Sequence, residues 1–216
     1  MNPATAWRLC AIIGVPAMAV SYMIGQSAGL AACPKPGDLE PVLALEFVRD
    51  LPQFGQFLVG KCPDGQLTAL ARDTYGFVPL YTLFVALAAW GAGITGRRIA
   101  QAAIVTIVAA AFADLVENAT LEALFEGGGG YDMLFWAVRL KFVLISVSLA
   151  LIGVLLLRHI EPLRFAGYGL ITAGGASILL LFTVPAAMIK TMAFGMILLL
   201  LIAITVAIRP SLAAAR

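Results

Sequence analysis

Acidic side chains interrupt an apolar stretch of the sequence that is long enough to cross a membrane. The interior of a lipid bilayer would exclude such charges. Asp114, Glu117 and Asn118 lie inside the run 99–125, which is otherwise mostly apolar. Asp114 and Glu117 are three residues apart, so a helix places them on one face with Asn118 beside them. Paired buried acids can supply a general acid and a general base, carry a proton, or bind a hard cation through their oxygens.

Basic residues occupy the next apolar run, at Arg139 and Lys141. The glycine turn 127–130 between the two runs is short, which predicts an antiparallel helical hairpin. Residues at equal distances from the turn then lie at similar depth. This symmetry predicts two contacts: Lys141 with Glu117, and Arg139 with Asn118 or Glu122. A charge at the centre of a span costs about 2.5–3.5 kcal/mol, so these side chains should face the protein interior.

Two interpretations of this cluster stay open. It can be a functional site, or it can be a structural network of ion pairs and hydrogen bonds that holds the hairpin together. Arg139 and Lys141 are two residues apart, so one helix cannot direct both equally at the acids. One of them is expected to meet Asp73 or Glu46, or to extend toward the membrane interface.

The composition predicts the fold class. The chain has 216 residues, of which 62% are hydrophobic and 12% charged, and its mean hydropathy is +0.98. A water-soluble globule could not cover its surface with so few polar groups. We therefore expect an all-α fold, a polytopic transmembrane helical bundle that forms a single transmembrane domain, residues 1–216. A span needs about 20 apolar residues, and about six runs qualify: 7–31, 74–95, 99–124, 133–157, 166–188 and 191–208.

The boundary between the fifth and sixth apolar runs is the one that the sequence marks least clearly. Only Ile189-Lys190 separates them, which indicates either a tight turn after Pro185 or a re-entrant segment. The sixth run carries no charge and reads as a packing or lipid-facing helix.

Lysine and arginine favour an orientation with both termini in the cytoplasm. The inner ends then carry Arg8, Arg97, Arg98, Arg158, Arg164, Arg209 and Arg216. The outer side carries the long loop 33–72. Cys33 and Cys62 both fall in this loop, where an oxidising compartment would allow a disulfide. Cys10 lies inside the first span and is expected to be an inert apolar side chain.

The outer loop also contains the pattern of an amphipathic helix. Asp38 can cap it, and apolar residues follow at helical spacing: Leu39, Val42, Leu43, Phe47 and Leu51. Such a helix would lie on the outer membrane surface or cover the bundle. The segment Cys62-Pro63-Asp64-Gly65 predicts a turn further along the loop. An alternative for the start of the chain is a lipoprotein signal that ends at Leu30-Ala31-Ala32-Cys33, with Cys33 lipidated.

Several chemistries lack the residues they need. The net charge of +2 comes without a basic block, so nucleic acid is not an expected partner. The single histidine, His159, lies at the inner end of the fourth run, far in depth from the acids. We therefore expect no metal site and no cofactor.

Short elements in order along the chain resemble a loosely defined family of uncharacterised bacterial membrane proteins. They are Glu46-Phe47, then Asp73 with Phe77 and Tyr81, then Asp114-x-x-Glu117-Asn118, then Lys141-Phe142. The resemblance covers about 39–157 and implies no activity. It implies that one site contains Glu46, Asp73, Tyr81, Asp114, Glu117, Asn118 and Lys141. It also points to the bacterial inner membrane.

The leading functional hypothesis is a polar pocket in the outer half of the bundle. This pocket would bind or translocate a small amphiphile, a lipid or a proton-coupled solute. Glu117 and Asp114 would titrate, Lys141 or Arg139 would serve as counter-ion or headgroup anchor, and Tyr81 and Asn118 would orient the ligand. One alternative is a membrane-embedded acid–base enzyme acting on a lipid. The other is an accessory or assembly subunit with a purely structural ion-pair network; its protein partners are not predicted.

Overall fold

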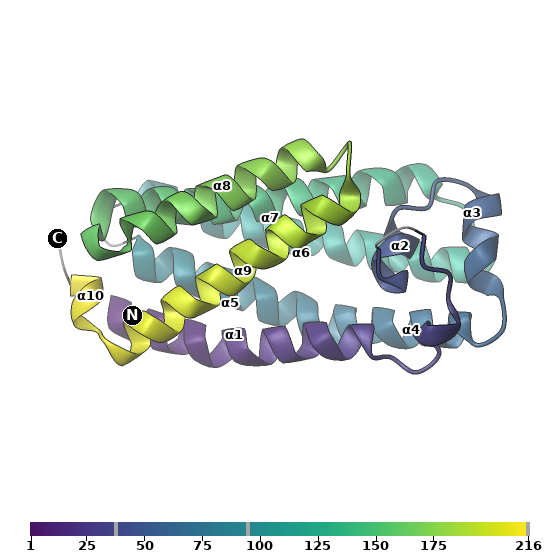
Figure 1. The fold of residues 1–216 in the computed structure, drawn as a ribbon, viewed down its shortest axis with the longest axis horizontal. Coiled ribbons are helices and arrows are strands. Elements are labelled where there is room, and N and C mark those ends of the chain that lie inside the picture. Colours follow the sequence, from purple (N-terminus) through teal and green to yellow (C-terminus); the bar gives the residue numbers. More distant parts are fainter. Residues whose placement is uncertain (37–38, 94–95, 215–216) are drawn as a thin grey trace. The chain divides into compact units, whose positions relative to one another are not determined.

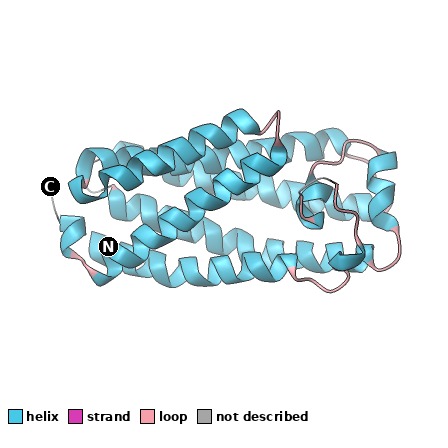
Figure 2. Cartoon of the chain, in the orientation of Figure 1, coloured by secondary structure: helices cyan, strands magenta, loops and turns pink. Residues whose placement is uncertain are grey.

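The computed structural model describes residues 1–36, 39–93 and 96–214, and this part of the chain is helical with no strand (Figure 2). Its helical segments include six that are long and apolar enough to cross a membrane. They are Pro3–Gly25, Cys62–Ala92, Arg97–Phe125, Tyr131–His159, Glu161–Leu180 and Pro185–Ile208. The expected all-α chain with six candidate spans is therefore present.

The elements follow one another as labelled in Figure 1. The long helices are α1 (Pro3–Gly25), α4 (Cys62–Arg72), α5 (Val78–Ala92), α6 (Arg97–Phe125), α7 (Tyr131–His159), α8 (Arg164–Leu180) and α9 (Pro185–Ile208). The short ones are η1 (Leu30–Ala32), α2 (Pro41–Glu46), α3 (Leu51–Gly55), η2 (Gln56–Leu58), η3 (Asp73–Phe77), η4 (Glu161–Leu163) and α10 (Ser211–Ala214). The η3 segment is a π-helical turn that joins α4 to α5 without a break.

The chain divides into two compact units. Unit 1 contains Met1–Pro16, Leu80–Ala110 and Phe142–Arg216, and unit 2 contains Ala17–Pro79 and Ala111–Lys141. The chain passes from one unit to the other within α1, within α6, near the start of α5 and within α7. The single transmembrane domain stays a prediction, and each unit is described by itself.

Unit 1 is packed through small residues. Helices α8 and α9 lie side by side (Figure 1). A Cβ atom placed on Gly14 of α1 would lie 2.7 Å from the ring of Phe84 in α5. A Cβ on Gly153 of α7 would likewise lie 2.6 Å from the carbonyl oxygen of Gly167 in α8. These glycines therefore let neighbouring helices approach closely, as expected inside a membrane.

Unit 2 holds the loop between α1 and α4 against the α6–α7 hairpin. Cys33 and Cys62 form a disulfide, which confirms the expected pairing and engages the sulfur that lipidation of Cys33 would need. The Phe54 ring of α3 contacts Phe125 of α6 edge-on, with ring centroids 5.1 Å apart. It also contacts Tyr131 of α7 at 6.4 Å. The loop is thus a packed cap on this end of the hairpin.

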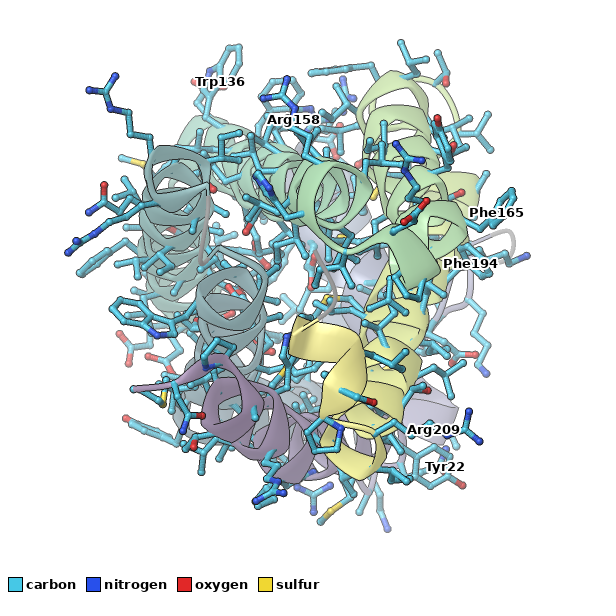
Figure 3. All side chains as sticks on the ribbon, turned by 90° about the vertical axis from the view of Figure 1, so that its left-hand side faces the viewer. Tyr22, Trp136, Arg158, Phe165, Phe194 and Arg209 are labelled. Carbon is cyan, nitrogen blue, oxygen red and sulfur yellow. A yellow bond between two sulfur atoms is a disulfide. The ribbon has the colours of Figure 1, made fainter. Side chains whose placement is uncertain are left out.

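Large apolar side chains lie on the outside, whereas several charged side chains of the hairpin lie inside. Tyr22, Trp136 and Phe165 point away from the ribbon in Figure 3 and are 71%, 65% and 90% exposed. Glu117 and Lys141, in contrast, are only 1% and 5% exposed. This distribution is the reverse of a soluble protein and suits helices surrounded by lipid.

Three expectations about boundaries are wrong. Pro185 does not precede a turn at Ile189-Lys190; it begins α9, and Lys190 lies inside that helix. Proline is favoured in a first helical turn because its missing N–H would have no partner there. For the same reason Cys62-Pro63-Asp64-Gly65 is the start of α4 and not a turn, so the second candidate span begins near residue 62.

The third correction concerns the amphipathic helix of the outer loop, which is two short helices. Helix α2 begins at Pro41 and ends at Glu46, and α3 begins at Leu51. Asp50 starts the second helix because its carboxylate accepts a hydrogen bond from the Gln53 backbone N–H at 2.9 Å. Asp38, the residue expected to cap the N-terminus of that helix, lies outside the described residues.

Candidate functional site: a lysine enclosed by carboxylates

The site is centred on the ammonium group of Lys141 in unit 2. Its Nζ lies 2.8 Å from Oε1 and 2.7 Å from Oε2 of Glu117, which is 24 residues earlier on the facing helix α6. It also lies 3.2 Å from Oδ1 of Asp114. The hairpin symmetry read from the sequence therefore predicted the Lys141–Glu117 contact correctly.

A third carboxylate reaches Lys141 from the cap. Glu46, the last residue of α2, places Oε2 3.2 Å from the same Nζ. Glu46 and Glu117 thus contact the same ammonium group from different elements. Two carboxyl groups held this close together do not both ionise readily, and they can share one proton.

A second layer of polar contacts extends the site toward α4 and η3. The Asn118 side-chain amide donates to Asp73 Oδ2 at 2.7 Å and to Thr74 Oγ1 at 3.0 Å. Gln66 of α4 donates to the backbone carbonyl of Pro41 at 2.9 Å, which ties α4 to α2. Gln66 and Thr74 were not among the expected site residues.

A signal for Gln66 existed in the sequence. Gln66 and Asp73 are seven residues apart, so a helix that starts near residue 62 presents both on one face. A turn at Cys62-Pro63-Asp64-Gly65, as the sequence predicts, would remove this relation. Thr74 had no comparable signal, because it sits in the π-helical turn η3, whose side-chain directions depart from the regular helical period.

The expected residues do not all join the cluster. Arg139 donates from Nη1 to the Phe135 carbonyl at 3.0 Å, and its guanidinium lies 3.4 Å from the Phe135 ring centroid. The Phe47 ring centroid, from the cap, is 6.0 Å away. Two residues turn a helix by about 200°, so Arg139 and Lys141 leave α7 in different directions. Tyr81 is buried and belongs to unit 1, so its place in the site stays a prediction.

The cluster is closed to solvent. Glu46, Asp114, Glu117 and Asn118 are between 1% and 8% exposed. The adjoining cavity has a volume of about 10 Å³ and is lined by polar groups of Glu46, Gln66, Asp73 and Asn118 together with apolar side chains. That volume is about the minimum for one water molecule, so no amphiphile fits beside the acids in this structure.

Electrostatics favour a proton in this interior. Burial raises the pKa of Glu46, Lys141 opposes that rise, and the Asp114 carboxylate adds to it. Desolvation dominates because a carboxylate that leaves water loses more than one nearby ammonium returns. Lys141 occupies the centre of the acids, where a cation would bind, and the described residues include no group of three or more His, Cys, Asp or Glu side chains able to hold a metal ion.

Comparisons with protein-family models, curated proteins and solved structures give no match. Function is therefore inferred from the residues of this chain. The arrangement can hold a proton between Glu46 and Glu117 beside the ammonium group of Lys141. Because Glu46 belongs to helix α2 of the cap, a change in protonation would alter the contact between α2 and the hairpin.

Proposed function

We propose that this chain is a proton-coupled integral membrane protein, in which the buried carboxyl cluster around Lys141 binds and releases a proton as a small solute or amphiphile is bound or translocated. One observation carries the proposal: three carboxyl groups, from Glu46, Asp114 and Glu117, share one ammonium at 3.2 Å or less in a closed interior.

The charges of the cluster do not balance unless it takes up protons. Three ionised carboxylates around one ammonium would leave an excess of about two negative charges in a region of low dielectric constant. Like-charged carboxylates in close contact do not all ionise, and one proton shared between two of them is the usual solution. Glu46 and Glu117, which both contact Lys141, are the pair we propose to share that proton.

The two carboxyl groups that share the proposed proton come from different parts of the chain, one from the cap and one from a candidate span. Glu46 comes from α2, outside the six membrane-crossing candidates, whereas Glu117 and Lys141 come from α6 and α7. Loss of the shared proton would make Glu46 and Glu117 repel each other and would weaken the hold on α2. Release of α2 would then open the closed cavity, which is how protonation would gate access for a ligand.

The membrane location belongs to the same proposal. We place the chain in a bacterial inner membrane with both termini in the cytoplasm, so that the cap faces the outer side. The Cys33–Cys62 disulfide supports this placement, because structural disulfides persist in oxidising compartments. The arginines at the opposite ends of the spans support it through the positive-inside rule.

Infrared spectroscopy of the purified protein tests the proton position. The wild type should show the carbonyl band of a protonated, buried carboxyl group at neutral pH, and this band should disappear reversibly as the pH is raised. Glu117→Gln and Glu46→Gln should each remove it. Glu122→Gln is the matched control, since Glu122 is exposed one turn further along α6. A wild type without the band would refute the proposal.

A structural role is the second candidate, and a specific observation favours it. Lys141 joins α2, α6 and α7 through its three ion pairs, and the neighbouring cavity leaves room for about one water. For an accessory or assembly subunit, an ion-pair network that holds these helices together would be sufficient. In that case Glu117→Gln should lower the melting temperature sharply, because it weakens the pairing of a buried lysine. A carboxyl band that ignores pH would support this candidate over proton coupling.

A further inference from the structure

A second feature of unit 2 lies outside the Lys141 cluster. A groove of about 730 Å³ runs between the end of α1 and the continuous helix formed by α4 and η3. Its walls include Val20 and Met23 of α1, and Leu67, Ala71, Arg72 and Gly76 of α4 and η3. The lining is mostly apolar, and Met23 is 50% exposed.

Gly76 lines the groove. A Cβ atom at this position would lie 3.0 Å from Cγ1 of Val20, so the missing side chain lets α1 and η3 approach closely at that level. The exposed Tyr75 ring also lines the groove. The groove is thus a shallow slot, open to the surroundings of the helices.

Arg72 supplies a positive charge on the groove wall. Its Nη1 donates to the Met23 carbonyl at 2.8 Å and to Ser27 Oγ at 3.1 Å, which fixes the guanidinium over the last turns of α1. Within the described part of the chain, Arg72 forms no ion pair and its other N–H groups make no hydrogen bond. An uncompensated guanidinium beside apolar walls is a binding site for a phosphate group.

The depth of Arg72 along its helix fits that ligand. About 20 residues separate Arg72 from Ala92 at the other end of the span, which corresponds to roughly 30 Å of helix. This length equals the thickness of the hydrocarbon core. Arg72 therefore lies at the level of the lipid phosphates, with Leu67 and Ala71 at or beyond it. Gly76 and the Val20 side chain that approaches it lie deeper, at the level of the acyl chains.

We infer that this groove binds one anionic phospholipid, with its phosphate on the Arg72 guanidinium and one acyl chain along the slot between α1 and α4. Because no acidic side chain pairs with Arg72, a headgroup of net negative charge is preferred over a zwitterionic one. The site shares no lining residue with the acidic cluster around Lys141, so it stands or falls independently of the proposed proton coupling.

Native mass spectrometry of the delipidated full chain tests this site, with phosphatidylglycerol or phosphatidylcholine added as probe. The wild type should retain one phosphatidylglycerol and bind phosphatidylcholine more weakly. Arg72→Gln should weaken phosphatidylglycerol binding about tenfold or more, the effect of losing a charge-assisted contact. Ala71→Phe should do the same by filling the slot while keeping Arg72. Lys61→Gln is the control, because Lys61 is an exposed cation just before α4.

Several outcomes would overturn the inference. Equal binding of the two lipids would show that charge does not select the ligand. Unchanged binding in both variants would show that the lipid lies elsewhere, and a loss confined to Arg72→Gln would show that the slot holds no chain. If Arg72→Gln fails to fold, Ala71→Phe and the preference between the two lipids decide the question.

Discussion

At the scale of single residues, Lys141 is the group on which the cluster depends. It contacts Asp114 and Glu117 from α6 and Glu46 from α2, all at 3.2 Å or less. Removal of a buried lysine from among carboxylates leaves their repulsion uncompensated, which typically costs about 3–5 kcal/mol. The stability of the site therefore depends on how many protons the acids hold, and pH becomes a direct probe of it.

Glu46→Gln should change how stability depends on pH. Glu46 has a raised pKa in the folded protein, so the folded state binds its proton more tightly than the unfolded state does. Its contribution to stability is complete below the unfolded pKa of about 4.3 and is lost as the pH rises through the folded-state pKa. The charged groups that surround Glu46 are Lys141, whose Nζ lies 3.2 Å from its carboxylate, and Asp114 and Glu117, which contact the same ammonium.

Thermal unfolding in detergent from about pH 4 to pH 9 measures this effect. The melting temperature of the wild type minus that of Glu46→Gln should decrease as the pH rises. Glu40→Gln is a suitable control, because the Glu40 side chain is 64% exposed and its ion pair with Lys35 lies at the surface. A difference that stays constant across this range would contradict the prediction.

At the scale of elements, the cap and the η3 turn determine where the acids lie. The π-helical turn Asp73–Phe77 interrupts the regular period of the second candidate span and brings both Asp73 and Thr74 to Asn118. Such turns occur frequently at functional sites, because they redirect side chains without breaking the helix. The cap is held from another direction by the disulfide, which closes the segment that contains α2 and α3.

Replacement of both Cys33 and Cys62 by alanine should loosen the cap. The disulfide links residues 29 apart, and the chain-entropy relation gives about 3–4 kcal/mol for a loop of that length. Hydrogen exchange should become faster in α2 and α3, while α8 and α9 of unit 1 should keep their wild-type rates. Unchanged exchange in α2 would mean that Glu46 and the Phe54 contacts hold the cap without the disulfide.

At the scale of the whole molecule, the sequence predicts what depends on local periodicity and simple symmetry. Six apolar runs gave six candidate spans, and the short turn after α6 placed Lys141 beside Glu117. The sequence leaves Glu46 as one of several possible partners of Lys141 or Arg139, because the contact depends on how the long loop folds back and not on any repeat. The resemblance grouped Glu46 with the other acids without giving a contact.

The errors also have physical causes. The residues around Pro63 and Pro185 predict turns, although a proline in the first turn of a helix is equally consistent with its fixed φ angle and missing N–H. Local sequence does not separate these two uses of proline. The direction of Arg139 depends on stacking with Phe135 and Phe47, and the second of these comes from a loop far away in sequence.

The orientation in the membrane is the prediction that tests the molecule as a whole. Cys10 is buried and the other two native cysteines form a disulfide, so an introduced cysteine is readily distinguished. Gly129, before α7, has open space around the position of a Cβ atom. Glu161, after α7, is exposed. Gly129→Cys and Glu161→Cys thus place thiols at opposite ends of one 29-residue helix.

A membrane-impermeant maleimide applied to bacterial spheroplasts should label Gly129→Cys directly and Glu161→Cys only after permeabilisation. This result follows if α7 crosses the membrane and the arginines stay in the cytoplasm. The reverse pattern would keep the span and invert the orientation, so that the cap and its disulfide would face the cytoplasm. Labelling of both positions from the same side would show that α7 does not cross, and the buried charges would then need an explanation without a bilayer.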